Sequence, residues 1–185
     1  MIFSLCVLLL LIFSIIPCVF ANGAADYYGV TISKFELYNG ASWITAFSGT
    51  SSELDIAAAS SGQSAGNFLS GLIVPDGTYT QVRVTPSPTF KFRGTDGAGN
   101  YTTAATGVGG STPTANINLK ATCTITLTGG NVPTAQTQDF SATPIVVKDG
   151  EPSHKVRVNF DVSAAIQNIG GELYPAPPTV TMNIQ

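Results

Sequence analysis

The chain has 185 residues, of which only 10% are charged, and its formal net charge at pH 7 is −3. Soluble domains usually contain about 25% charged residues, so we expect a neutral surface of small polar side chains. The Lys and Arg residues are scattered, whereas phosphate binding needs clustered basic groups. This composition excludes nucleic acid and anionic membrane surfaces as partners.

Residues 1–21 form an uncharged, strongly apolar segment that ends in Val19-Phe20-Ala21. An apolar run closed by small residues at the positions read by signal peptidase is typical of an export signal. We therefore expect cleavage after Ala21 and an extracellular or cell-surface location for residues 22–185, which suit one domain. The alternative is a retained leader that anchors the chain in a membrane.

Apolar and polar residues alternate through most of residues 22–185, which is the pattern of half-buried strands. The first expected strand, residues 30–38, carries a shift in the pattern near Ser33-Lys34 that indicates a bulge. Asn39-Gly40 follows it as a hairpin turn. Further strands are expected at residues 42–47, 52–59, 78–85, 90–93, 115–128, 145–148, 155–162 and 179–185, and near Phe140.

The segments between these strands carry turn and loop signals. Residues 60–67 are expected to form a loop, and residues 68–74 are apolar enough to be buried before the turn at Pro75-Asp76-Gly77. Residues 94–114 are rich in Gly, Ala and Thr and are expected to form a surface excursion. One helical turn is expected within residues 163–169.

About ten strands without a long helix indicate an all-β fold. We expect a single antiparallel two-sheet β-sandwich with Greek-key connections, of the immunoglobulin or transthyretin type. A closed β-barrel is the alternative.

Cys123 is the one cysteine outside the leader, so the exported chain cannot form an internal disulfide. It lies in a run of alternating apolar residues that extends from Ile117 to Leu127. We therefore expect a buried, inert thiol. The intervening positions, Thr122 to Thr128, are expected to form a solvated strand face.

No set of residues in the sequence indicates catalysis, and we expect no enzyme, no cofactor and no metal site. His154 is the only histidine and stands beside a turn, and the carboxylates are mostly isolated. Asp96 lies in a Gly-rich loop, but the acid spacing of a calcium loop is missing, so calcium there is the minor alternative. Asn100-Tyr101-Thr102 is an N-glycosylation sequon, which makes Asn100 a candidate modification site.

Two stretches carry motifs that resemble those of a known family. Residues 72–84 contain Pro75, Gly77, Tyr79 and Arg83 in the pattern P-x-G-x-Y-x-x-[IV]-R, and residues 156–163 end in Phe160-Asp161-Val162-Ser163, which is similar to the pattern F-D-[AV]-x-S. Both resemble a secreted β-sandwich domain of unknown function that is common on bacterial and archaeal cell surfaces. The resemblance implies the fold and export but no catalytic role.

Many members of that family are lipoproteins, and this chain departs from them. Pro17 stands where the lipobox requires a small residue before Cys18. The departure leaves free secretion or assembly as the expectation.

Export, low charge and the missing catalytic set favour a structural subunit that packs against copies of itself in a filament or surface layer. The alternative is an adhesion module that binds glycan or a surface partner through aromatic stacking faces. Candidate faces are Trp43, Tyr27, Tyr28, Tyr101 and Tyr174. Trp43 follows a tight turn on a strand, so we expect it to be partly buried.

Residues 179–185 form a terminal strand behind the spacer Pro175-Ala176-Pro177-Pro178. Its apolar face consists of Val180, Met182 and Ile184. Exchange of this strand between copies would propagate an open fibre. Pairing within its own sheet is the alternative.

Overall fold

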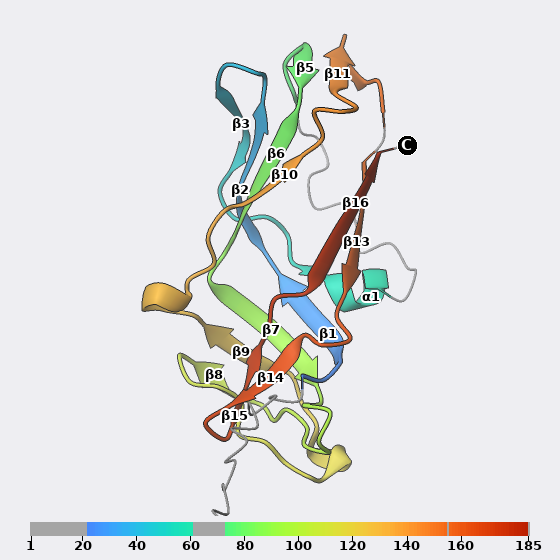
Figure 1. Cartoon of the computed structure of the whole chain (residues 1–185). Coiled ribbons are helices and arrows are strands. Elements are labelled where there is room, and N and C mark those ends of the chain that lie inside the picture. Colours follow the sequence, from blue (N-terminus) through green and yellow to red (C-terminus); the bar gives the residue numbers. More distant parts are fainter. Residues whose placement is uncertain (1–21, 61–72, 155, 185) are drawn as a thin grey trace, which may run out of the picture.

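The structure is a computed structural model that describes residues 22–60, 73–154 and 156–184 (Figure 1). Strands predominate, helical segments are short, and none of the sheets built from the described strands closes into a barrel. The predicted all-β, sandwich-like fold is therefore confirmed, and the barrel alternative is wrong.

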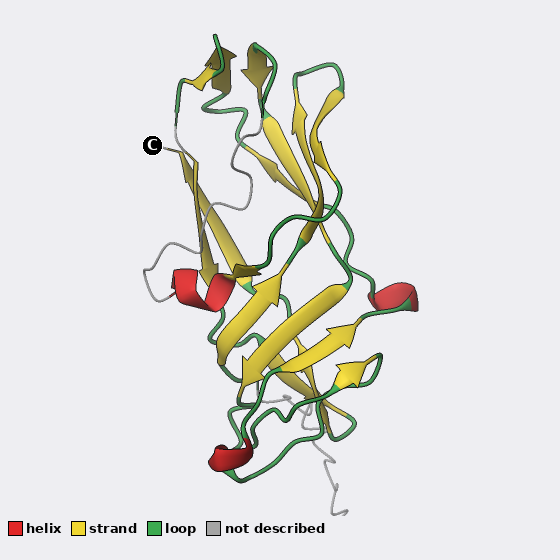
Figure 2. Ribbon diagram, turned by 180° about the vertical axis from the view of Figure 1, so that it is seen from behind, coloured by secondary structure: helices red, strands yellow, loops and turns green. Residues whose placement is uncertain are grey.

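The larger layer consists of two sheets, a lower and an upper one (Figure 2). The strand order is β4-β1-β7-β9-β8 in the lower sheet and, read in the same direction, β3-β2-β6-β10 in the upper sheet. Each strand of the upper sheet is thus the neighbour along the chain of the strand in the corresponding position of the lower sheet. The strands of the lower sheet are β1 (Ala25–Val30), β4 (Leu54–Asp55), β7 (Thr89–Gly94), β8 (Thr106–Gly107) and β9 (Cys123–Thr126). Those of the upper sheet are β2 (Ile32–Tyr38), β3 (Trp43–Ser48), β6 (Gln81–Pro86) and β10 (Gln136–Asp139).

A crease separates the two sheets of this layer, because each long strand is interrupted at about the same level. β1 passes into β2 at Thr31, whose carbonyl accepts a 2.8 Å hydrogen bond from the N–H of Ser87 in the break between β6 and β7. Just beyond, the register of β2 against β6 shifts between Ile32 and Lys34. This irregularity confirms the bulge predicted near Ser33.

The second layer is built from three small sheets. β11 (Ile145–Lys148) pairs with β5 (Gly77–Tyr79) and β12 (Glu151–Pro152). The other two sheets are antiparallel pairs of strands. In one, β13 (Val156–Asp161) pairs with β16 (Thr179–Ile184). The other is a hairpin of β14 (Ile166–Ile169) and β15 (Glu172–Pro175). The helical segments are α1 (Ile56–Ser60), η1 (Ile117–Leu119) and η2 (Gly129–Asn131).

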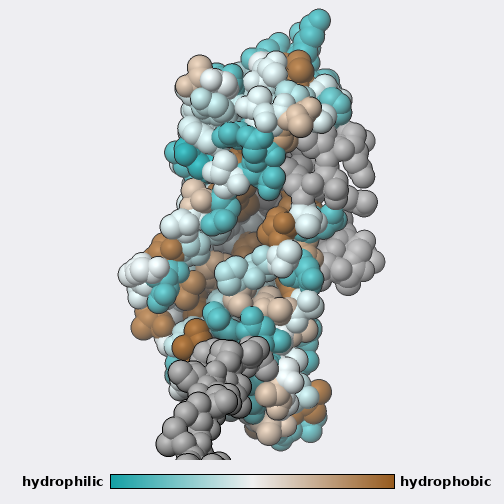
Figure 3. Space-filling model, viewed as in Figure 1, coloured by the Kyte–Doolittle hydropathy of each residue, from teal (hydrophilic) through white to brown (hydrophobic). Residues whose placement is uncertain are grey.

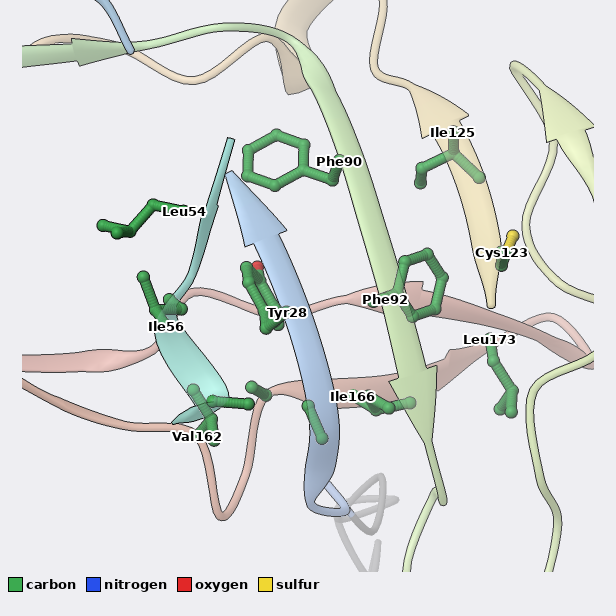
Figure 4. Packing of buried hydrophobic residues seen from close by; sticks show 13 residues of the cluster. Tyr28, Leu54, Ile56, Phe90, Phe92, Cys123, Ile125, Val162, Ile166 and Leu173 are labelled. Atoms are coloured by element: carbon green, nitrogen blue, oxygen red, sulfur yellow. The ribbon is translucent and has the colours of Figure 1, made fainter. Parts of the chain in front are cut away.

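Two hydrophobic clusters hold the layers together. The lower cluster joins β1, β7 and β9 to α1 and the β14–β15 pair, and Phe92, Cys123, Ile166 and Leu173 are fully buried in it (Figure 4). The upper cluster joins β2 and β6 to β5 and β11. Its buried members are Leu37, Tyr79, Val82, Phe140, Ile145 and Val147.

The expected strand at residues 52–59 is wrong beyond Asp55. The Oδ1 atom of Asp55 accepts a 3.1 Å hydrogen bond from the N–H of Ala57, as a helix N-cap does, and a run of alanines follows. The chain therefore turns into α1. Leu54 and Ile56 are nevertheless both buried in the core.

The expected strand at residues 115–128 is also shorter than predicted. Asn116 Oδ1 accepts a 3.0 Å hydrogen bond from Asn118 N–H and starts η1, so that Ile117 and Leu119 are exposed. Regular pairing begins only at Cys123, and β8 joins β9 in parallel.

Two further predictions do not hold for the described residues. The chain makes only a short turn after Asp161, whose Oδ1 accepts the N–H of Ser163 at 2.9 Å, and residues 166–169 form β14 in place of the expected helical turn. Ile73, expected to be buried, is 87% exposed. Residues 61–72, which include most of the expected loop and apolar run, lie outside the described residues.

Residues 94–114 do more than cover the surface. Asp96, Thr102 and Ser111 are buried, and Ser111 exchanges two 2.8 Å backbone hydrogen bonds with Leu173. The excursion is thus tied to the β14–β15 pair, a contact that sequence alternation does not report.

Candidate functional site

A groove of about 2440 Å³ lies between the two layers, lined by residues from both sheets of the larger layer and from β11, the β13–β16 pair and the β14–β15 pair. The floor is apolar, with Phe35, Leu37 and Val84 on one side and Val158 and Phe160 on the other. Among the described residues that line it, none is Asp, Glu, Lys or Arg. The polar groups around it are neutral side chains such as Gln136, Gln138, Asn159 and Gln167.

Exposed aliphatic side chains gather on this groove. Many of the large hydrophobic residues that the structure leaves exposed belong to its lining, namely Val108 (68%), Val132 (41%), Val158 (38%), Ile169 (49%) and Val180 (50%). Figure 3 shows hydrophobic atoms within a recess at mid-height of this face. The two layers therefore present apolar surface to each other without closing over it.

Unpaired strand edges border the groove. Within the described part of the chain, β10 pairs only with β6, and β16 pairs only with β13. Both strands contribute lining residues. A free edge offers backbone N–H and C=O groups to any further strand.

The predicted assembly residues lie on β16. Val180 lines the groove, whereas the side chains of Met182 and Ile184 lie outside the described ones. The strand pairs with β13 over six residue pairs, from Val156 with Ile184 to Asp161 with Thr179. In this structure the terminal strand thus pairs within its own chain, the second of the two arrangements that the sequence leaves open.

The sequon residue Asn100 is engaged in a hydrogen-bond network. Its Nδ2 donates to Asp96 Oδ2 at 2.7 Å, and its backbone N–H donates to Asp96 Oδ1 at 3.0 Å. The N–H of Ala98 and the Nδ2 of Asn168 complete the shell of the Asp96 carboxylate. Burial acts to raise the pKa of Asp96, but these hydrogen bonds outweigh it and the pKa is lowered.

Thr102, the third sequon residue, is fully buried. Its Oγ1 donates to the carbonyl of Ala121 and accepts from Gly94 N–H. The sequon is therefore part of the packed structure.

Trp43 is half-buried, as predicted, and one face of its ring is covered. The Arg83 guanidinium carbon lies 4.1 Å from the ring centroid, and the Tyr38 ring lies 5.2 Å away, centroid to centroid. Arg83 also donates from Nε to Glu36, a buried carboxylate that Lys34 contacts as well. Alternation marked Glu36 as a strand residue but gave no sign of this buried ion pair.

The hydrogen bonds from Arg83 hold the pKa of Glu36 at about 2, against the effect of burial. Of its two partners, Arg83 lies on the neighbouring strand β6, and Lys34 lies on the same strand as Glu36, β2. It serves to order that face of the sheet.

Cys123 is fully buried, as predicted, and burial raises the pKa of its thiol. His154 lies at the rim of the groove, where its Nδ1 is 2.8 Å from the hydroxyl of Ser153. Cys123 lies on β9 in the lower sheet, whereas His154 follows β12 in the second layer.

The described residues contain no group of three or more His, Cys, Asp or Glu placed to hold a metal ion, and Asp96 is saturated by hydrogen bonds from protein N–H groups. Within the same residues, no helix has the length and hydrophobicity needed to cross a bilayer.

The groove itself was not predicted from the sequence. Alternation identifies the apolar face of each strand but says nothing about the space between two layers. The exposed Val158 and Val180 carry the same local pattern as buried valines.

Comparisons with protein-family models, with curated proteins and with solved structures gave no match for this chain. The resemblance to the secreted β-sandwich family thus stays a prediction.

Proposed function

We propose that the protein is an exported, non-catalytic structural subunit of a cell-surface assembly, a filament or surface layer, in which copies pack against each other. The observation that carries this proposal is the groove, whose described lining residues include no Asp, Glu, Lys or Arg, together with its exposed aliphatic rim. Large apolar patches on a monomer are typical of contact sites between proteins. Covering this rim removes hydrophobic surface from water without desolvating a charge.

The size and edges of the groove favour a polypeptide partner over a small ligand. Pockets for small molecules have volumes of roughly 300–1,000 Å³, well below the 2440 Å³ found here. The free edges of β10 and β16 provide backbone hydrogen-bonding groups, which a neighbouring chain satisfies and an apolar ligand does not.

A glycan-binding adhesion module is the competing function, and Trp43 is its natural stacking platform. Arg83 and Tyr38 both lie against this ring. A sugar would have to displace the guanidinium or use the remaining face, so this geometry favours the assembly function.

Two matched variants test the proposal. Ile169 is 49% exposed on the groove rim, and Ile117 is 56% exposed on η1 away from the groove. We expect Ile169→Lys to weaken self-association at least roughly tenfold, equivalent to about 1.4 kcal/mol, in light scattering and to shorten polymers in electron microscopy. Ile117→Lys should leave both unchanged.

The outcome can contradict the proposal in two ways. Wild-type protein that stays monomeric at high concentration removes the basis for an assembly. Equal effects of the two variants show that association does not use the groove.

A further inference from the structure

We propose that β16 is an exchangeable strand, and that in the assembly each copy places its β16 against β13 of the next copy. This inference rests on the proposed function and identifies the contact by which copies join. Three features support it: the anchor of the chain at Ala176, the ladder with β13 that holds the strand, and the composition of the groove around it.

The anchor lies immediately before the strand, at Ala176. This residue is buried, its N–H donates to the carbonyl of Ala165 at 2.7 Å, and its carbonyl accepts from the hydroxyl of Tyr28 at 3.0 Å. Ala165 and Tyr28 both belong to the lower hydrophobic cluster. The chain is therefore fixed to the core as far as Ala176.

Beyond Ala176 the chain depends on β13 alone. Within the described residues, β16 makes a ladder with no other strand, and β13 likewise has no second partner. Thr179, Val180 and Thr181 are exposed, as are Asp161 opposite Thr179 and Asn159 opposite Thr181. β13 is held by α1 and, through Phe160, by the lower hydrophobic cluster. β16 is held mainly by its ladder with β13, so its release leaves β13 in place as the acceptor.

The connection between anchor and strand suits exchange. Pro177 and Pro178 restrict the backbone to extended conformations, so the spacer resists folding back and directs the strand away from the core. Short, stiff hinges favour the exchange of identical elements between copies. The core part of the subunit stays intact when the strand moves, because the hinge lies outside the anchored segment.

The arriving strand brings no charged side chain, and on the acceptor strand β13, which contains Arg157 and Asp161, the side chain of Asp161 is exposed. Residues 173–185 contain no charged side chain, and the described residues that line the groove contain none of Asp, Glu, Lys or Arg. A strand that arrives from a neighbour thus restores the ladder without bringing a charged side chain into the groove. The two-residue periodicity fixes its register, because a slip by one residue turns Val180 away from the groove.

The geometry favours an open chain. Each copy has one donor strand at its C-terminus and one acceptor edge on β13. When a copy donates to one neighbour and receives from another, the contact is heterologous and repeats head to tail.

Cross-linking tests this exchange. Asn159 and Thr181 face each other across the β13–β16 ladder and are both exposed. Two variants, Asn159→Cys and Thr181→Cys, are mixed, unfolded, refolded at high concentration and treated with a short bifunctional thiol reagent. We expect a cross-linked dimer that contains one chain of each variant. Wild-type protein, whose Cys123 is buried, should give none.

A second pair serves as the matched control. Lys148 and Glu151 face each other across the tight turn between β11 and β12, are both exposed and do not line the groove. Mixed Lys148→Cys and Glu151→Cys variants should give at least roughly tenfold less mixed dimer. The double variant Asn159→Cys/Thr181→Cys, diluted as a refolded monomer, should give the link within one chain, which confirms the register.

The results separate this inference from the proposed function. Polymers in the microscope without mixed dimers overturn strand exchange and leave assembly through the groove rim standing. Protein that remains monomeric, with links only within single chains, overturns both.

Discussion

Arg83 donates from Nε to Glu36 at 2.7 Å while its guanidinium carbon lies 4.1 Å from the centre of the Trp43 ring. A second cation, Lys34, contacts the other oxygen of Glu36 at 2.7 Å. One buried carboxylate therefore fixes an arginine that in turn covers the tryptophan. The three strands β2, β3 and β6 are linked through this chain of contacts.

Acid should weaken the fold through Glu36. Its pKa is lowered from 4.5 to about 2 in the folded protein, so the unfolded chain binds a proton at higher pH than the folded one. The stabilisation is complete above pH 4.5 and is lost as pH falls from 4.5 towards 2. Glu36→Gln should unfold more easily by about 2 kcal/mol at neutral pH and lose most of this dependence. Urea titrations between pH 2 and pH 7 measure both; an unchanged acid slope in the variant contradicts the assignment.

Trp43 should report the arginine that covers it. As the single tryptophan, it gives an unambiguous emission spectrum, and we expect a maximum between those of buried and fully exposed indole. Arg83→Gln should shift the emission to the red, because water replaces the guanidinium. Oligosaccharides should leave the spectrum unchanged. A blue shift on adding sugar supports the adhesion module.

Asn100 should remain unmodified in the folded protein. Its amide nitrogen is held by Asp96, and the sequon threonine is buried. Asn100→Ala should lower stability by about 1–2 kcal/mol, because Asp96 loses a hydrogen-bond donor. Mass spectrometry of the protein purified from its host tests the first statement, since a glycan at Asn100 refutes it.

Cys123 should behave as an apolar core residue. Cys123→Ser should lower the free energy of unfolding by about 1–3 kcal/mol through burial of a hydroxyl, without a change in assembly state. A bulky thiol reagent should label Cys123 only in denaturant. Rapid labelling of native protein, or a dimer that disappears on reduction, is the contrary result.

The sequence predicted the strands well where alternation was unbroken and local. β2, β3, β11 and β13 lie close to their expected ranges, and the bulge near Ser33 is present. Errors arose where a polar side chain redirects the backbone. Asp55 starts α1 and Asn116 starts η1, and both signals are visible in the sequence once helix caps are weighed against periodicity.

The candidate site was less accessible to sequence reasoning. Val180 was selected for its place on a terminal strand, yet its exposure depends on how far the β13–β16 pair stands from β2 and β6. The ion pair of Glu36 and Arg83 joins residues that are far apart in the chain. Such contacts follow from strand order, which periodicity leaves undetermined.

The neutrality of the groove has a consequence for the conditions under which copies can join. Coulomb attractions between exposed charges fade with ionic strength, because the screening length falls from about 10 Å at 0.1 M salt to about 3 Å at 1 M. A contact made by the described lining residues, which include no Asp, Glu, Lys or Arg, escapes this weakening, and salts that are excluded from protein surfaces strengthen it. The proposed assembly, if it is built on this groove, would therefore tolerate large changes in salt concentration.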